Sequence, residues 1–151
     1  MANKNPEVVI LSGGFGTRMS HIFPDTPKPL IPVSGTPILE HIINECAKYG
    51  LTKILLVLHF GEDKIRQYFG SGKKFGVEIT YYTEKEPLGT GGALLSVKSL
   101  LAPKFLVLYA DVYCEVNLAN FMDFHKKSNS SVSILVHPNS HPHDSDLVVL
   151  D

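Results

Sequence analysis

The stretch LSGGFGTRMSHIFPDTPK, from Leu11 to Lys28, decides how the rest of the sequence is interpreted. It follows the apolar run Val8–Leu11, which is too short for a helix and β-branched enough for a buried strand. Three glycines then fall within four residues: Gly13, Gly14 and Gly16. Because glycine has no Cβ, such a loop lets backbone N–H groups approach an anionic ligand. The stretch predicts a phosphate-binding loop at the carboxyl end of a first strand.

Cations and prolines lie on the same connection. Arg18 and Lys28 add positive charge, and the segment that carries Lys28 is stiffened by three prolines, Pro24, Pro27 and Pro29. Both cations suit the neutralisation of phosphate charge. The alternative is that both are ordinary solvated charges.

Two common glycine-rich fingerprints do not fit this loop. The dinucleotide-binding pattern G-x-G-x-x-G needs a third glycine, and Met19 stands in its place. The P-loop pattern fails at Gly72-Lys73, because Gln67 occupies the position of its first glycine and Lys74 that of its Ser or Thr. The loop must therefore be interpreted with the rest of the chain.

Composition limits the class of protein. The chain has 151 residues, 44% hydrophobic and 19% charged, with a net charge of −1. We expect one domain, residues 1–151. The small net charge argues against a large footprint for nucleic acid or anionic membranes. No apolar run reaches the roughly 18 residues of a membrane span, and the N-terminus lacks a secretory pattern. We expect a cytoplasmic protein in which Cys46 and Cys114 are reduced core thiols.

Strand and helix patterns alternate along the chain. Strands are expected at residues 8–11, 53–58, 77–82, 105–109, 131–136 and 146–150. Helices are expected at residues 36–50, 62–68, 90–101 and 118–127, the first capped by Thr36 with Pro37 in its first turn. This alternation predicts an α/β fold with a doubly wound, mostly parallel, Rossmann-like sheet that carries helices on both faces.

Polar residues follow several of the predicted strands. The glycine loop comes after Leu11, Glu84 after the third strand and Asp111 after Tyr109. Because ligands of such sheets bind outside the carboxyl ends of the strands, we expect one shared site. Asp111 suits a Mg²⁺ ligand, since magnesium takes one or two carboxylates together with phosphates and water. The alternative role for Asp111 is a helix cap or turn.

Four motifs in order resemble the signature of the sugar-1-phosphate nucleotidyltransferases. LSGGFGTRM is followed by PKPLIPVSGTPILEHII, then EPLGTGGAL (86–94) and FLVLYADV (105–112). Ser12 and Met19 replace the alanine and leucine usual in that family. The resemblance covers nearly the whole chain and implies a fold of the nucleotide-diphospho-sugar transferase type.

The resemblance also implies a reaction and a set of site residues. A sugar-1-phosphate oxygen attacks the α-phosphorus of a nucleoside triphosphate and expels pyrophosphate; this nucleophile is already an anion, so no general base is needed. Arg18 and Lys28 are the implied catalytic cations, and Asp111 the ligand of Mg²⁺. The implied nucleotide-binding residues are Leu11, Ser12, Gly13, Gly14, Gly16, Thr17, Glu84, Pro87, Gly89 and Thr90.

Glu84 lies five residues before Gly89. In the resembled family, the residue at this spacing binds the hydrogen-bonding edge of the base. A carboxylate only accepts hydrogen bonds. Guanine offers two adjacent donors, N1–H and N2–H₂, whereas uracil and thymine offer one. The residue type therefore favours GTP as the substrate. The alternative is an exposed glutamate at a strand end.

The final stretch, HPNSHPHDSDLVVLD (137–151), is similar to guanylyltransferases that act on manno-configured sugars such as D-glycero-D-manno-heptose 1-phosphate. We interpret its histidines as a surface loop. Asp146 stands near a glycine position of that family, and we expect it to bind a sugar hydroxyl. Family members usually continue with an E-K-P segment and a second metal-binding aspartate. The chain therefore resembles the nucleotide-binding part, truncated in its C-terminal sugar-binding part.

Other functions stay open at this point. The same fold could serve a non-catalytic nucleotide or sugar-phosphate sensor, or a regulatory subunit, and a homo-oligomer is possible. A guanylyltransferase for a pterin cofactor has a similar opening motif, but the segments PKPLIPV and EPLGTGGAL argue against it.

Overall fold

The computed structural model describes residues 5–13, 21–138 and Val148. Its centre is a parallel sheet of four strands: β1 (Val8–Ser12), β4 (Lys53–Leu58), β5 (Glu78–Thr83) and β6 (Leu106–Tyr109). Their order in the sheet is β5-β4-β1-β6. The chain therefore extends the sheet in one direction from β1 through β5 and then returns to the other side of β1 with β6. The carboxyl ends of β1 and β6 flank this point of reversal.

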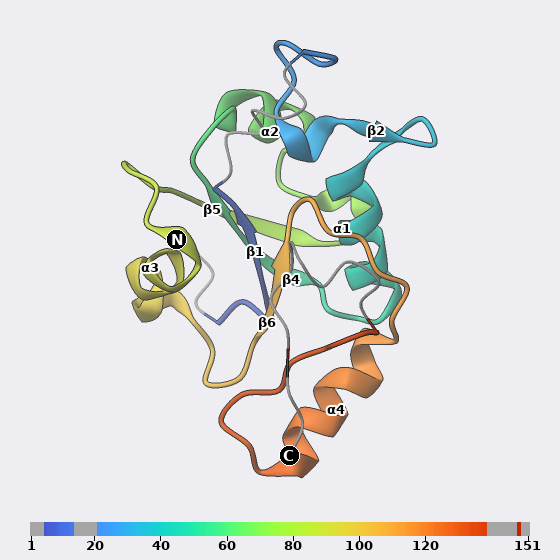
Figure 1. The fold of residues 1–151 in the computed structure, drawn as a ribbon, viewed down its shortest axis with the longest axis vertical. Coiled ribbons are helices and arrows are strands. Elements are labelled where there is room, and N and C mark those ends of the chain that lie inside the picture. Colours follow the sequence, from blue (N-terminus) through green and yellow to red (C-terminus); the bar gives the residue numbers. More distant parts are fainter. Residues whose placement is uncertain (1–4, 14–20, 139–147, 149–151) are drawn as a thin grey trace.

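Helices cover both faces of the sheet (Figure 1). Val8 and Ile10 of β1 belong to a core with α1 (Ile38–Lys48), α2 (Glu62–Phe69) and α4 (Leu118–Ser128). Val9 and Leu11 point to the opposite face, where they share a smaller core with α3 (Gly89–Ser96). All five residues of β1 are buried because each face of the strand meets a helix layer. The predicted fold class is confirmed.

Short elements connect the layers. They are the 3-10 helices η2 (Lys28–Leu30), η3 (Lys73–Phe75) and η4 (Lys98–Leu100) and a hairpin of β2 (Pro32–Val33) and β3 (Thr36–Pro37). The predicted cap of the first helix was wrong: α1 begins at Ile38, and Thr36 pairs with Val33 in the hairpin. The helix predicted over 90–101 is divided into α3 and η4.

The strand predicted over 131–136 does not form in the described structure. Residues 132–138 have no regular secondary structure, and Val132 and Ile134 are 71% and 72% exposed. β-Branched residues form a strand only where a neighbouring strand supplies hydrogen-bond partners. Within the described part of the chain, β6 is the edge nearest in sequence and pairs only with β1. The strand predicted over 146–150 lies outside the described residues, except for Val148.

The two cysteines differ in their exposure to solvent. Cys46 is a buried residue of α1, and burial raises the pKa of its thiol to about 12. Cys114 is exposed, so the expectation of a second core thiol was wrong, because the residues after β6 leave the sheet and run over the surface. Among residues 5–13 and 21–138, no helix is long and apolar enough to cross a membrane.

Candidate functional site

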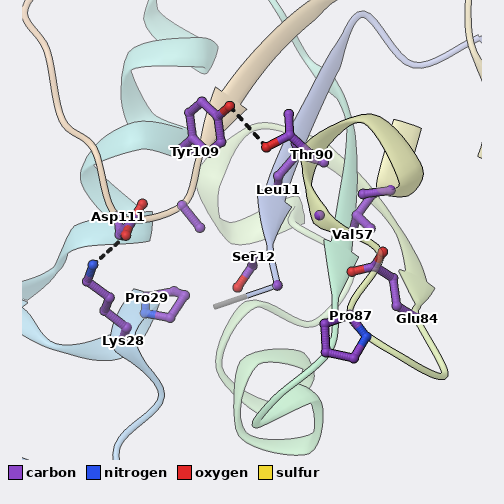
Figure 2. A pocket seen from close by; sticks show the side chains of 14 residues that line it. Leu11, Ser12, Lys28, Pro29, Val57, Glu84, Pro87, Thr90, Tyr109 and Asp111 are labelled. Atoms are coloured by element: carbon purple, nitrogen blue, oxygen red, sulfur yellow. Dashed lines mark hydrogen bonds and ion pairs between the residues drawn. The ribbon is translucent and has the colours of Figure 1, made fainter. Parts of the chain in front are cut away.

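A pocket of about 330 Å³ opens at the carboxyl ends of the parallel strands. It lies where the strand order reverses between β1 and β6, which is the usual ligand position in doubly wound sheets. The residues that line it are Leu11, Ser12, Gly13, Lys28, Pro29, Val57, Glu84, Pro87, Gly89, Thr90, Ala93, Tyr109, Ala110 and Asp111 (Figure 2). The sheet therefore brings to one place segments that are up to 100 residues apart in the sequence.

One end of the pocket carries an ion pair. Lys28 Nζ donates to Asp111 Oδ2 at 2.5 Å, and the two side chains are 41% and 34% exposed. Lys28 opens η2 after Pro27, and Pro29 is buried beneath it, so prolines fix the backbone on both sides. Asp111 comes directly after Ala110, whose N–H donates to the carbonyl of Leu11 and continues the sheet. Both charges are accessible to a ligand.

The other end of the pocket carries a buried carboxylate. Glu84 is only 5% exposed, and its Oε1 atom has no hydrogen-bond partner among the described residues. Its backbone is fixed, because its N–H donates to the Leu58 carbonyl at 2.8 Å and its own carbonyl lies 3.1 Å from His59 Nδ1. The interpretation of Glu84 as an exposed strand-end residue is excluded. A buried acceptor without a partner is costly, which favours a ligand that donates to it.

Glycine lies against this carboxylate. A Cβ at Gly13 would stand 3.2 Å from Glu84 Oε2, closer than most such contacts. Gly89, at the start of α3, has φ = +67°, a conformation that other residues rarely adopt. Between the two ends, Thr90 Oγ1 lies 3.3 Å from the Tyr109 hydroxyl and joins α3 to β6 (Figure 2).

The structure brings most of the predicted site residues together. The pocket is lined by Leu11, Ser12, Gly13, Lys28, Glu84, Pro87, Gly89, Thr90 and Asp111. The remaining predicted residues lie outside the described part of the chain: Gly14, Gly16, Thr17, Arg18 and Asp146. Sequence reasoning missed Pro29, Val57, Ala93, Tyr109 and Ala110. The position of Tyr109 and Ala110 directly before Asp111, at a strand end, could have indicated them.

The donor set limits the metal that the site could hold. Among the described residues, no three or more His, Cys, Asp or Glu side chains form a metal-binding group. Asp111 supplies one carboxylate beside the pocket. This fits a hard cation such as Mg²⁺, which binds through one or two carboxylates and takes its other ligands from phosphates and water. It does not fit a site built by protein ligands alone.

Three curated relatives are similar to this chain in sequence. Mannose-1-phosphate guanylyltransferase from Mycobacterium tuberculosis is 33% identical over 89% of the chain. D-glycero-alpha-D-manno-heptose 1-phosphate guanylyltransferase from Campylobacter jejuni is 35% identical over 75%, and the bifunctional protein GlmU from Methanococcus maripaludis is 40% identical over 78%. The chain spans 38%, 51% and 28% of the length of these three proteins, in the order given.

Solved structures show the same fold. HddC from Yersinia pseudotuberculosis, complexed with GMP-PN, matches with a TM-score of 0.70 and 34% identity over 80% of this chain and 54% of that one. A Bacillus anthracis protein assigned as a glucose-1-phosphate thymidylyltransferase matches with a TM-score of 0.75 over 82% of this chain and 51% of that one; its 23% identity supports the fold alone. The model of the nucleotidyl transferase family matches residues 7–149. The chain belongs to the nucleotidyl transferase family.

Proposed function

We propose that this protein transfers a nucleotidyl group from a nucleoside triphosphate, preferably GTP, to a sugar 1-phosphate of the manno type. The products are a nucleotide sugar and pyrophosphate. One observation carries the proposal: a single pocket has an unpartnered buried carboxylate, Glu84, at one end and the Lys28–Asp111 ion pair at the other. The first end suits a base with donors, and the second suits phosphates.

The reaction is a substitution at phosphorus. An oxygen of the sugar phosphate forms a bond to the α-phosphorus, and the bond between that phosphorus and the oxygen bridging to the β-phosphate breaks. Because the nucleophile is already an anion, the protein must mainly position the two substrates and stabilise charge. Lys28 supplies a positive charge at the pocket, and Gly13 brings the backbone after β1 close to the ligand. We assign Arg18 the same role as Lys28.

Asp111 is the residue that would hold Mg²⁺ together with the phosphates. The bound cation would neutralise phosphate charge. In the ligand-free protein the same carboxylate accepts from Lys28. Metal at Asp111 and phosphate at Lys28 therefore compete with the ion pair for the same charges and weaken it. The cost is small, because both side chains are more than a third exposed and a pair in that setting contributes at most about 1 kcal/mol.

The preference for guanine follows from Glu84. A carboxylate that faces guanine accepts from N1–H and N2–H₂, whereas one that faces uracil or thymine meets a single N3–H between two carbonyl oxygens. The unpartnered Oε1 atom supports a ligand with a donor at this point. Two guanylyltransferases among the relatives, and a relative crystallised with GMP-PN, support the same base.

The choice of sugar rests on relatives. Two of them are named for mannose 1-phosphate and D-glycero-alpha-D-manno-heptose 1-phosphate, which share the manno configuration. We assign Asp146 to a hydroxyl of this sugar.

A release assay for pyrophosphate tests the proposal. GTP, ATP, UTP and dTTP are each combined with mannose, heptose and glucose 1-phosphates, with Mg²⁺ and then with EDTA. We expect release with GTP and a manno-configured phosphate, and none with EDTA. The assay is run on this chain and on any longer polypeptide that contains it. Binding of GTP without release in either would instead indicate a sensor or regulatory subunit.

A further inference from the structure

His41 of α1 contacts two segments that lead away from the phosphate end of the pocket. Its Nε2 atom lies 2.9 Å from the carbonyl oxygen of Val33, and its ring centroid lies 5.7 Å from that of Tyr113. Val33 comes five residues after Lys28, and Tyr113 two residues after Asp111. His41 does not line the pocket. One side chain outside the pocket therefore joins the segments that carry both partners of the ion pair.

The hairpin after Lys28 needs such a support. Its strands pair Pro32 with Pro37, and neither proline has an N–H to donate, so the ladder is weak. His41 adds a donor, the Nε2–H group, to the Val33 carbonyl. The hairpin is also tied at its base, where Ile38 N–H donates to the Ile31 carbonyl and Ile31 N–H to the Lys28 carbonyl, both at 3.1 Å. These bonds connect the Lys28 backbone to α1.

The segment after Asp111 lies along the same helix. The ring of Tyr113 is tilted by 59° against that of His41, an arrangement typical of favourable aromatic pairs. Desolvation, followed by the charges of Glu45 and Glu115, raises the pKa of the Tyr113 phenol. Glu45 lies one turn after His41 on α1. The start of α1 is therefore a common support for both segments.

We propose that His41 is a positioning residue that fixes the separation of the Lys28 and Asp111 segments. Phosphates and metal compete for the charges of the ion pair, so the pair is a weaker connection between the two segments in the complex. The contacts of His41 involve a backbone carbonyl and a neighbouring ring, and they persist when the pair opens. This inference rests on the proposed function, because it assumes that phosphates bind at this end of the pocket.

The test compares ligands for the two ends of the pocket. Calorimetry measures the affinity of wild type and His41→Ala for Mg²⁺-pyrophosphate and for guanosine, which has no phosphate. Because small misplacements of binding groups have large effects, we expect a loss of roughly 10-fold or more for pyrophosphate. Guanosine affinity should change by less than about twofold, since Glu84 is held by β4 and β5 and not by α1.

Further variants separate a positioning role from a general loss of stability. His41→Gln keeps a donor for Val33 and should recover part of the affinity, and His41→Phe keeps the packing against Tyr113. His125→Ala is the matched control, because His125 also joins its helix, α4, to a following segment through one ring nitrogen, at Ser133. If His41→Ala does not fold, Tyr113→Ala removes one of the two contacts at a residue that is 42% exposed. In a Lys28→Ala background, His41→Ala should have little further effect on pyrophosphate.

The outcomes distinguish a failure of the proposed function from a failure of the role of His41. If wild type binds neither pyrophosphate nor guanosine, the proposed function is wrong. If wild type binds both, and His41→Ala keeps full pyrophosphate affinity or weakens both ligands equally, the function stands and the role of His41 is overturned. Selective loss of pyrophosphate supports the role.

Discussion

Glu84 and Asp111 are both carboxylates that follow strands of one sheet, yet their surroundings differ. Glu84 is 5% exposed and has an oxygen without a partner in the described structure, whereas Asp111 is paired with Lys28 and its side chain is 34% exposed. A buried acceptor discriminates between ligands, because a ligand that fails to donate leaves the desolvation penalty in place. An accessible ion pair exchanges partners at little cost. We therefore expect the Glu84 end to determine which base binds, and the Lys28–Asp111 end to determine charge-dependent binding and rate.

The largest effect is expected at Lys28. Lys28→Ala removes the positive charge that we propose acts on the transferred phosphate, so turnover should fall roughly 100- to 1,000-fold while the fold is kept. Steady-state pyrophosphate release and thermal melting measure the two quantities. Lys98→Ala is the control, because Lys98 is an exposed lysine of η4 that does not line the pocket. Unchanged turnover in Lys28→Ala would remove this residue from the mechanism.

The second-largest effect is expected at Glu84 and concerns the choice of base. Wild type should prefer GTP over UTP and dTTP by roughly 10- to 150-fold, because one charge-assisted hydrogen bond is worth about 1.5–3 kcal/mol. The amide of Glu84→Gln donates hydrogen bonds as well as accepting them, so the affinity ratio of GTP to UTP or dTTP should become smaller in this variant. Competition binding of the triphosphates checks both values. Glu86→Gln is the control, since Glu86 is an exposed neighbour. A guanine preference that survives in Glu84→Gln would mean that another group reads the base.

Asp111→Asn should weaken the binding of GTP with Mg²⁺ and strengthen the binding of pyrophosphate without metal. With Mg²⁺, GTP should bind roughly tenfold more weakly or worse, because the amide lacks the charge that a hard cation prefers. In EDTA, pyrophosphate should bind about twofold to fivefold more tightly, because Lys28 loses its competing partner. Titration calorimetry measures both. Asp123→Asn is the matched control, since Asp123 pairs with Lys126 on the surface of α4 at 3.2 Å. A loss of affinity under both conditions would contradict the exchange of partners.

The smallest effect is expected at Gly13. A Cβ there would lie 3.2 Å from Glu84 Oε2, so Gly13→Ala should displace the carboxylate slightly and lower the guanine preference by a few-fold. Gly91→Ala provides the comparison, because a Cβ at Gly91 meets nothing within 4 Å. Equal competition-binding profiles for the two variants would show that the carboxylate adapts without cost.

Much of the fold could be predicted because the strands are locally determined. The run KILLVL is β4 with the predicted bounds, and β1 extends only one residue beyond the prediction, to Ser12. Apart from Lys53 at the start of β4 and Ser12 at the end of β1, both runs are apolar because helices cover both faces of the sheet. Ligands bind outside the carboxyl ends of parallel strands, and this rule also predicted that Glu84 and Asp111 lie at the edge of the sheet that carries the pocket. For these strands, the arrangement of segments that are distant in the sequence could be predicted from local sequence patterns.

Other features depend on contacts that a sequence does not contain. The segment 131–136 has the composition of a strand but has no partner strand in the described structure. The burial of Glu84 depends on its packing beside Gly13, 71 residues earlier. The Lys28–Asp111 pair joins residues that are 83 positions apart. Each of these is set by the sheet order and not by neighbouring residues.

The central claim is that one nucleotide spans the pocket from Glu84 to the Lys28–Asp111 pair. A crystal structure of the protein with Mg²⁺ and a non-hydrolysable GTP analogue tests it most directly. We expect guanine N1 and N2 within hydrogen-bond distance of the Glu84 carboxylate, with Lys28 on a phosphate and separated from Asp111. A base bound away from Glu84, or Lys28 still paired with Asp111 beside the bound phosphates, would contradict it.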